Sequence, residues 1–584
     1  MTSRTHRRAA ALFVATLMLS ACSAAGGSGA DKAGGASTPV PPVIETLGNA
    51  ADSTGPAVPV QGAKSGGTVT VLQSADFSHL DPARVYSTDA GTASLLITRS
   101  LTKTKFIGNR GVLVGDLATD TGTASDGGKT WTFTLKSGLK FDDGTEVTAE
   151  HVKYGIERSY DKSKAGGPNY VQTALSGADY ANAYPGPAAG QSLPDSVLEA
   201  KGRTVVFHLK EAHADFPFSV SWPSTAPVQQ SKDGKDYDRS PQSTGPYKIT
   251  HHDDTSMVME RNQYWDASTD PLRHNYPDSW KFEFGVEAQQ ASQRIVAQSG
   301  SDKNALSFTN QIHSSFVPQS QTDSELQART ISGMTPYVRY FNINTSRVTD
   351  LEVRKALLTA FPRQQVRQVY GGATYGEFGS TILSPSTIGF QSYNLFPDVP
   401  TNGDAAGAKR ILEKAGKTGT KIVYAYTQDD NGEKGALLIA DALQKAGFEV
   451  VKKPIDRTSY LDAIIKKDNG FDLYNAGWAA DSPTGAGTIP ALFDSSNADG
   501  SYNYSKLNDP AVDAEIKRVG QLADLNEQAA AWAALDKKIM EQVPVIPFVN
   551  TRSTILTGSN IGGAFIAPTS SALSPLNIYI KSGS

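Results

Sequence analysis

The sequence contains little cysteine, no excess of charge of one sign, and no hydrophobic run long enough to cross a membrane. A single cysteine among 584 residues excludes an internal disulfide and a thiolate metal cluster. The 55 basic and 59 acidic residues nearly balance, so the composition does not predict nucleic-acid binding. Hydrophobic residues make up 39% of the chain. At roughly 150 residues per domain, this chain is long enough for about two to three large lobes.

The first residues have the pattern of a secretory signal peptide. Three arginines precede residues 9–21, a mostly apolar stretch that is too short to cross a bilayer. The stretch ends in a Leu-Ser-Ala-Cys run that resembles the bacterial lipobox. We therefore expect a signal peptide at 1–21, cleavage before Cys22 and lipidation of Cys22, which places the protein on the outer face of the plasma membrane. The alternative is an ordinary signal peptide with an incidental cysteine.

Residues 22–65 are mostly Ala, Gly, Ser, Pro, Thr and Val. A segment so poor in large apolar side chains cannot offset the entropy that it would lose on folding. We therefore expect a flexible tether between the lipid and the folded body.

From residue 66 the sequence alternates between strand and helix patterns. Thr148 is expected to cap a helix without a capping box, because His151 stands where a Glu is usual. Beyond residue 336, helices alternate with buried strands, which predicts an α/β lobe with a largely parallel sheet. Further expected elements are strands at 68–72, 131–135, 203–209, 421–426 and 448–452, a hairpin of 247–250 with 257–260, and helices at 89–101, 353–361, 405–415 and 434–446.

Several segments match, in order, the pattern of a known family. The longest match, 131–152, contains a strand, a Lys-Ser-Gly-Leu-Lys-Phe run, an Asp-Gly turn and the start of a helix. Shorter matches are Ser-Thr-Gly-Pro-Tyr at 243–247, Phe-Asn-Ile-Asn at 341–344 and Asn-Ala-Gly-Trp at 475–478. Together they resemble the family 5 extracellular solute-binding proteins, which serve ABC importers of peptides, nickel and some other solutes. One departure is Pro362, which cannot cap a helix where the family usually has an Asp.

The resemblance implies an α/β, two-lobed fold of the periplasmic-binding-protein type (type II, with the family's extra domain), whose lobes are joined by a two-strand hinge. Lobe I is expected to be discontinuous, at 66–102, 220–335 and 546–584. The extra domain is expected at 103–219 and lobe II at 336–545. The resemblance further implies a monomer that is not an enzyme, needs no cofactor, and delivers its ligand to an ABC permease in the membrane.

Peptide binding requires a carboxylate for the ligand's ammonium and main-chain partners for its backbone. The resemblance implies that Gly477, Trp478 and Ala479 pair the peptide backbone and that Asp481 binds the ammonium. Two alternatives stay open. Asp481 precedes Ser-Pro, a sequence typical of a helix N-cap, and Trp478 is equally consistent with a core aromatic.

The other lobe is expected to contribute a ligand-pairing strand at Tyr86, Ser87 and Thr88. The aromatic stretch from Phe216 to Trp222 is expected to pack within a lobe, with the lining of the cleft as the alternative.

The family includes nickel-binding proteins, so we ask whether the histidines of this sequence could form a metal site. His251 and His252 form the only histidine cluster, and they lie at the tip of the expected hairpin. Adjacent residues at a turn tend to point apart, whereas a metal needs ligands that converge. No metal site is therefore predicted.

The leading functional hypothesis is a lipid-anchored receptor that captures di- to oligopeptides for import. A first alternative keeps the fold but binds an oligosaccharide or a metal chelate. A second is an exported hydrolase, against which stands the absence of a Gly-x-Ser-x-Gly elbow and of a His-Glu-x-x-His helix. A third is a sensor or adhesin that uses the same cleft without transport.

Overall fold

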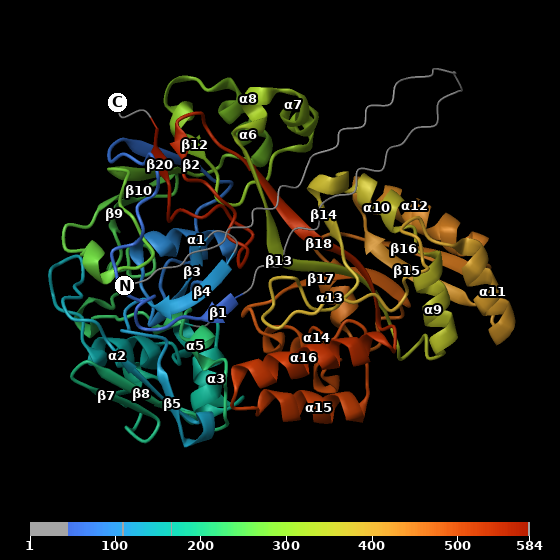
Figure 1. The fold of residues 1–584 in the computed structure, drawn as a ribbon, viewed down its shortest axis with the longest axis horizontal. Coiled ribbons are helices and arrows are strands. Elements are labelled where there is room, and N and C mark those ends of the chain that lie inside the picture. Colours follow the sequence, from blue (N-terminus) through green and yellow to red (C-terminus); the bar gives the residue numbers. More distant parts are fainter. Residues whose placement is uncertain (1–44, 108–109, 165, 582–584) are drawn as a thin grey trace, which may run out of the picture. The chain divides into compact units, whose positions relative to one another are not determined.

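Two groups of secondary-structure elements flank a pair of long antiparallel strands, β13 (Thr330–Ile343) and β18 (Val545–Leu556), in the computed structural model of the protein (Figure 1). The structure describes residues 45–107, 110–164 and 166–581. The signal peptide and Cys22 lie outside these residues. Within the described residues, no helix combines the length and the apolar character needed to cross a bilayer.

The first lobe is built on a five-stranded sheet of order β12-β2-β11-β10-β9. Val69 and Val71 of β2 are fully buried, which explains why this β-branched run forms a central strand. The strands are β2 (Thr68–Leu72), β9 (Tyr247–His252), β10 (Ser256–Arg261), β11 (Ser279–Glu283) and β12 (Ala305–Leu306). The hairpin predicted at β9 and β10 is confirmed.

The helices and short strands of this lobe surround that sheet. Helix α1 starts one residue before the predicted 89–101 and ends at Ile97, where Thr98 adopts an extended backbone. The elements are α1 (Thr88–Ile97), α6 (Ala288–Ala297), α7 (Val317–Thr322), α8 (Ser324–Gln327), β19 (Ile561–Gly562) and β20 (Tyr579–Ile580).

A further region carries a four-stranded antiparallel sheet of order β5-β6-β8-β7 with its own core. Trp131 and Phe133 of β6 point into that core, as the alternating pattern predicts. The elements are β5 (Thr123–Ser125), β6 (Thr130–Thr134), β7 (Leu198–Lys201), β8 (Thr204–His208), α2 (Ala149–Arg158), α3 (Tyr170–Ser176), α4 (Tyr180–Ala183) and α5 (Phe216–Ser219).

The start of α2 corrects one prediction. Thr148 occupies the N-cap position as expected, but a reciprocal contact is present, because Nδ1 of His151 accepts the backbone N–H of Thr148 at 3.2 Å. An imidazole nitrogen therefore replaces the Glu oxygen of the usual capping box. Pro362 provides no side-chain cap for α10 (Arg363–Val369), as predicted.

The tether predicted for 22–65 is wrong for its last part. Strand β1 (Glu45–Leu47) pairs in parallel with β4 (Arg110–Gly115), which also pairs with β3 (Thr102–Ile107). Buried Ser53 accepts the backbone N–H of Gly115 at 2.8 Å. Main-chain hydrogen bonds and one small side chain hold this segment, so its lack of large apolar residues did not exclude order.

We expect deletion of residues 42–54 to expose the edge of β4 and to accelerate hydrogen exchange at Leu113 and Gly115, because the main-chain groups of these two residues face the deleted segment: the carbonyl of Leu113 accepts from Gly48 at 2.7 Å, and the N–H of Gly115 donates to Ser53. Hydrogen exchange followed by mass spectrometry checks this, with a chain that begins at residue 42 as the matched control. Unchanged exchange in β4 would contradict the placement of β1.

The second lobe contains a six-stranded sheet of order β14-β18-β13-β17-β15-β16. The predicted largely parallel sheet is wrong: β13, β14, β17 and β18 pair antiparallel, and only the pairs that β15 makes with β16 and β17 are parallel. The difference arises because the two crossing strands enter the middle of this sheet. The remaining strands are β14 (Gly376–Phe378), β15 (Lys421–Thr427), β16 (Glu449–Ile455) and β17 (Leu473–Ala479).

Helices cover both faces of this sheet. Neighbouring residues of β13 point to opposite faces, so that Phe341 packs into one core and Tyr340 into the other. The core around Phe341 lies under α9 (Leu351–Ala360), α11 (Ala405–Ala415) and α12 (Asp430–Lys445). The core around Tyr340 lies under α13 (Tyr460–Ile465), α14 (Ile489–Phe493), α15 (Pro510–Gly520) and α16 (Leu525–Met540).

The crossing strands change register between Met334 and Val338. At this break, Oγ1 of Thr335 lies 2.6 Å from Oγ1 of Thr551, and side chains take over part of the hydrogen bonding between the strands. Pro336, which lacks a backbone N–H, lies in the same gap. The pairing shifts once more between Arg339 and Tyr340, so the longest interruption of the strand pair lies at 335–337.

Candidate functional site

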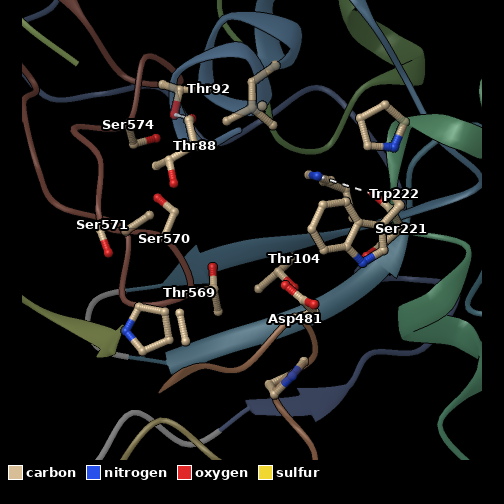
Figure 2. A pocket seen from close by; sticks show the side chains of 18 of the residues that line it. Thr88, Thr92, Thr104, Ser221, Trp222, Asp481, Thr569, Ser570, Ser571 and Ser574 are labelled. Carbon is tan, nitrogen blue, oxygen red and sulfur yellow. Dashed lines mark hydrogen bonds between the residues drawn. The ribbon is translucent and has the colours of Figure 1, made fainter. Parts of the chain in front are cut away.

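A cavity of about 250 Å³ lies between residues of the two lobes, next to the break in the crossing strands. Pro336, Ala479 and Asp481 line it from the second lobe and the crossing strand, whereas α1 and β3 line it from the other side (Figure 2). Hydroxyl groups gather along one part of its wall, from Thr88, Thr92, Thr104, Thr569, Ser570, Ser571 and Ser574.

Asp481 connects parts of the chain that are far apart in the sequence. Its Oδ2 accepts a hydrogen bond from the hydroxyl of Tyr86 at 2.8 Å and another from the hydroxyl of Tyr170 on α3. The indole of Trp222 lies 5.7 Å from the ring of Tyr86 and 6.1 Å from that of Tyr170, between centroids. An acidic oxygen thus lies among three aromatic side chains, an environment that favours a cation.

The neighbourhood of Asp481 changes the ionisation of the two phenols. Burial, together with the negative charge of Asp481, raises the pKa of Tyr86 and of Tyr170 above the ordinary range. Both phenols therefore stay protonated and donate to the carboxylate across the physiological range of pH. The N-cap alternative for Asp481 is wrong, because the helices that follow within the described chain begin at Gly485 and Ile489, with Thr484 and Thr488 at their N-cap positions.

The backbone of β17 is open on one side near the cavity. β13 pairs with Gly477, Trp478 and Ala479 on one side, whereas β15 pairs only with Leu473 and Tyr474 on the other. Among the described residues, no strand covers the second side of Gly477 to Ala479. Ala479 also lines the cavity, so this edge is available to an extended ligand in the manner of an added strand.

Trp478 and Gly477 are not among the residues that line the cavity. The indole N–H of Trp478 donates to the carbonyl of Gly487 at 2.7 Å, and its ring lies 5.0 Å from that of Tyr502. The side chain of Trp478 therefore packs within its own lobe. This agrees with the alternative prediction that Trp478 is a core aromatic.

The close packing around position 477 leaves no room for a side chain and therefore requires a glycine. A Cβ at this position would lie 2.4 Å from Cε1 of Tyr337 and 2.6 Å from the backbone oxygen of Val338. We expect Gly477→Ala to lower the free energy of unfolding by about 1–3 kcal/mol, because backbone atoms cannot move aside cheaply. Denaturant unfolding measures this, and Gly520→Ala is the matched control, since a Cβ there meets no atom within 4 Å. Equal stability of the two variants would contradict this packing.

Tyr86, Ser87 and Thr88 all line the cavity, and pairing of this segment with a ligand stays a prediction, although helix α1 already includes Thr88. Thr88 is the first residue of α1, and Ser87 is its extended N-cap residue. Asp238 fixes the turn that leads into this segment, because its Oδ1 accepts the backbone N–H groups of Leu80 and Asp81 at 3.1 and 3.0 Å. The segment therefore presents side chains and a helix start to the cavity.

A second cavity of about 840 Å³ shares Trp222 and Asp481 with the first. It lies between α3 and the helices α15 and α16. The aromatic stretch from Phe216 to Trp222 divides accordingly: Phe216 is buried in a core, whereas Trp222 faces both cavities.

Sequence reasoning missed Tyr170, because nothing in the local sequence indicates that α3 reaches Asp481. The histidine pair does not converge on one point. His251 contacts Asp253 at 2.8 Å, and His252 contacts Asp76 at 2.8 Å and the carbonyl of Arg239 at 2.7 Å.

The fold and the cavity define the class of protein: two lobes joined by a pair of crossing strands, with a binding cavity between them. Residues 112–500 match the model of the bacterial extracellular solute-binding proteins, family 5. The chain belongs to this family, and it is a solute-binding protein rather than an enzyme. The predicted two-lobed fold, its extra domain and its hinge are confirmed.

Individual relatives agree with this assignment. The glutathione-binding protein GsiB of Escherichia coli O6:K15:H31 (strain 536 / UPEC) is 24% identical over 86% of this chain and 92% of its own. The structure of clavulanic acid biosynthesis oligopeptide binding protein 2 has a TM-score of 0.80 and 27% identity, over 91% of this chain and 98% of that one. The unliganded open form of the periplasmic murein tripeptide binding protein MppA has a TM-score of 0.73 and 20% identity, over 89% and 98%.

Proposed function

We propose that this protein captures short peptides in the cavity beside Asp481 and delivers them to an ABC permease. The observation that carries the proposal is the position of Asp481, whose carboxylate lies among Tyr86, Tyr170 and Trp222 at the junction of the lobes. In this arrangement the peptide ammonium displaces one or both phenols from Asp481. The open edge of β17 then pairs the peptide backbone.

The names of the relatives support the same ligand class, because those proteins bind glutathione, oligopeptides and a murein tripeptide. All three names denote short peptides. Closure of the lobes over the ligand follows from its contacts with both of them, since only differential contacts shift the population.

The proposal extends to the location of the protein. Cleavage before Cys22 and lipidation of its thiol would anchor the protein, as a monomer, on the outer face of the plasma membrane. Metabolic labelling with a radioactive fatty acid tests this, with Cys22→Ser as the control. Incorporation of label into both proteins, or into neither, would contradict the anchor.

The test of ligand class is native mass spectrometry of protein purified without denaturation, before and after mild unfolding. We expect the release of a ladder of short peptides, and we expect trialanine or glutathione to release heat on titration into the emptied protein. An oligosaccharide is the second candidate, because the exposed rings of Tyr86 and Tyr170 are surfaces on which sugars stack. Release of a discrete sugar or of a metal complex would contradict peptide capture.

A further inference from the structure

The cavity beside Asp481 is lined by one other charged residue of the described chain, Lys103 of β3. Nζ of Lys103 donates a hydrogen bond to the carbonyl of Ser221 at 3.2 Å, and that carbonyl also accepts from Oγ of Ser100 at 3.0 Å. Lysines such as Lys153 and Lys164 contact carboxylates. Lys103 is in no ion pair within the described residues. A half-buried ammonium in a cavity is therefore left with one shared carbonyl.

The charges behind Lys103 do not provide the missing anion. Arg99 and Arg273 contact Asp116 at 2.7 and 2.8 Å, and Arg273 also contacts Asp270 at 3.2 Å. All four side chains are almost completely buried. Two arginines and two aspartates balance one another, so this network has no negative charge left for a neighbouring cation.

A second lysine next to the network, Lys136, has a hydrogen-bond acceptor for every N–H group of its ammonium. Nζ of Lys136 donates to the carbonyls of Gly115, Asp116 and Thr269 at 2.9, 2.7 and 3.0 Å. Those three bonds use all three of its N–H groups. Lys103 has the same three donors and uses one of them on the protein.

Burial and the repulsion of nearby arginines destabilise both lysine charges. Burial and the charge of Arg273 lower the pKa of Lys103 to about 8, against the opposing effect of Asp116. Burial and the charge of Arg99 have the same effect on Lys136, whose pKa is also lowered to about 8. An anion that enters the cavity would therefore relieve an existing excess of positive charge.

From these contacts we infer that Lys103 binds a free carboxylate of the ligand, so that the cavity selects zwitterionic peptides over peptides whose carboxylate is blocked. The inference rests on the proposed function, because it places a second group of the same ligand in the same cavity. Asp481 and Lys103 bind charges of opposite sign, and the hydroxyl groups of the cavity wall are available to the neutral polar atoms of the ligand.

The test is calorimetric titration of trialanine and trialanine amide into the wild-type protein and Lys103→Met. Loss of a charge-assisted hydrogen bond is expected to weaken binding roughly tenfold to hundredfold. Amidation should have this effect on wild type and little effect on Lys103→Met. Lys103→Arg keeps the charge and should keep the preference for the free acid.

Lys105→Met is the matched control on the same strand. Nζ of Lys105 donates to the carbonyl of Asp52 at 2.9 Å, and Lys105 is not part of the cavity lining. This variant should keep the wild-type preference. The comparison of acid and amide on wild type needs no variant, so it tests the inference even if Lys103→Met does not fold.

Equal affinity of wild type for the acid and the amide, or an unchanged preference in a folded Lys103→Met, would overturn the role of Lys103 and leave peptide binding intact. Failure of wild type to bind trialanine, its amide and glutathione would instead contradict the proposed function itself.

Discussion

Asp481→Asn should weaken the binding of trialanine by roughly a hundredfold or more, because the variant keeps the shape of the side chain and loses the charge that an ammonium requires. The carboxylate is half-buried among Tyr86, Tyr170 and Trp222, so water does not screen it fully. Isothermal titration calorimetry measures the change.

A ligand variant separates this effect from a general loss of structure. N-acetyl-trialanine has no ammonium, so we expect it to bind weakly and equally to wild type and Asp481→Asn. Asp254→Asn is the control variant, since its carboxylate is exposed on the hairpin and contacts Arg239 instead of the cavity. If Asp481→Asn bound trialanine as wild type does, Asp481 would not be the ammonium site.

The second large effect is expected on stability, from Arg158→Met. Arg158 is buried on α2, and its guanidinium contacts Asp81 at 2.5 Å and Asp233 at 2.7 Å. Removing it leaves two buried carboxylates without an arginine, which should lower the free energy of unfolding by about 3–5 kcal/mol. Denaturant unfolding at pH 7 measures this. Arg239→Met is the control, because Arg239 is itself exposed and contacts exposed Asp254 at 3.0 Å and Asp76 only at 3.7 Å, so each pair is worth less than about 1 kcal/mol.

The same variant should change the dependence of stability on pH. Burial alone would raise the pKa of Asp233, but hydrogen bonds from Arg158 and Lys164 hold it well below the ordinary range. A depressed carboxylate pKa stabilises the folded state above the unfolded value, about 4, and this contribution is lost as the pH falls. The gap between wild type and Arg158→Met should therefore be widest near pH 7 and shrink below about pH 4. A gap that does not change with pH would contradict this origin of the stability.

Arg158 also links stability to the site. Its partner Asp81 begins the turn that Asp238 holds, and Tyr86 follows that turn directly. Loss of the arginine should therefore loosen the segment that presents Tyr86 to Asp481. We expect hydrogen exchange in residues 82–87 to be faster in the variant than in wild type. The increase should be larger there than in the five-stranded sheet of the same lobe.

The regular elements were predictable because their signals are local. The periodicity of apolar residues, together with glycines at the ends of elements, located β2, β6, α11 and β15 within one or two residues. The antiparallel character of the sheet in the second lobe was not predictable from such signals. It depends on β13 and β18, which enter from the other lobe, and no local pattern reports the direction of a partner strand.

The site was predictable only as far as the family resemblance extended. Asp481, Ala479 and Tyr86 line one cavity, as the resemblance implied. Tyr170 and Lys103 were missed because the contacts that place them in the site join residues far apart in the sequence. Tyr170 is 311 residues from Asp481, and Lys103 is 118 residues from Ser221. The tether was overestimated for a related reason, since main-chain pairing of β1 leaves no mark on composition.

A crystal structure of the protein with trialanine bound would test the central claim most directly. The account predicts a peptide between the lobes with its ammonium within hydrogen-bond distance of Asp481, its carboxylate at Lys103, and its backbone along the open edge of β17. A peptide held elsewhere on the molecule, or one in the cavity with its ammonium turned away from Asp481, would contradict the account.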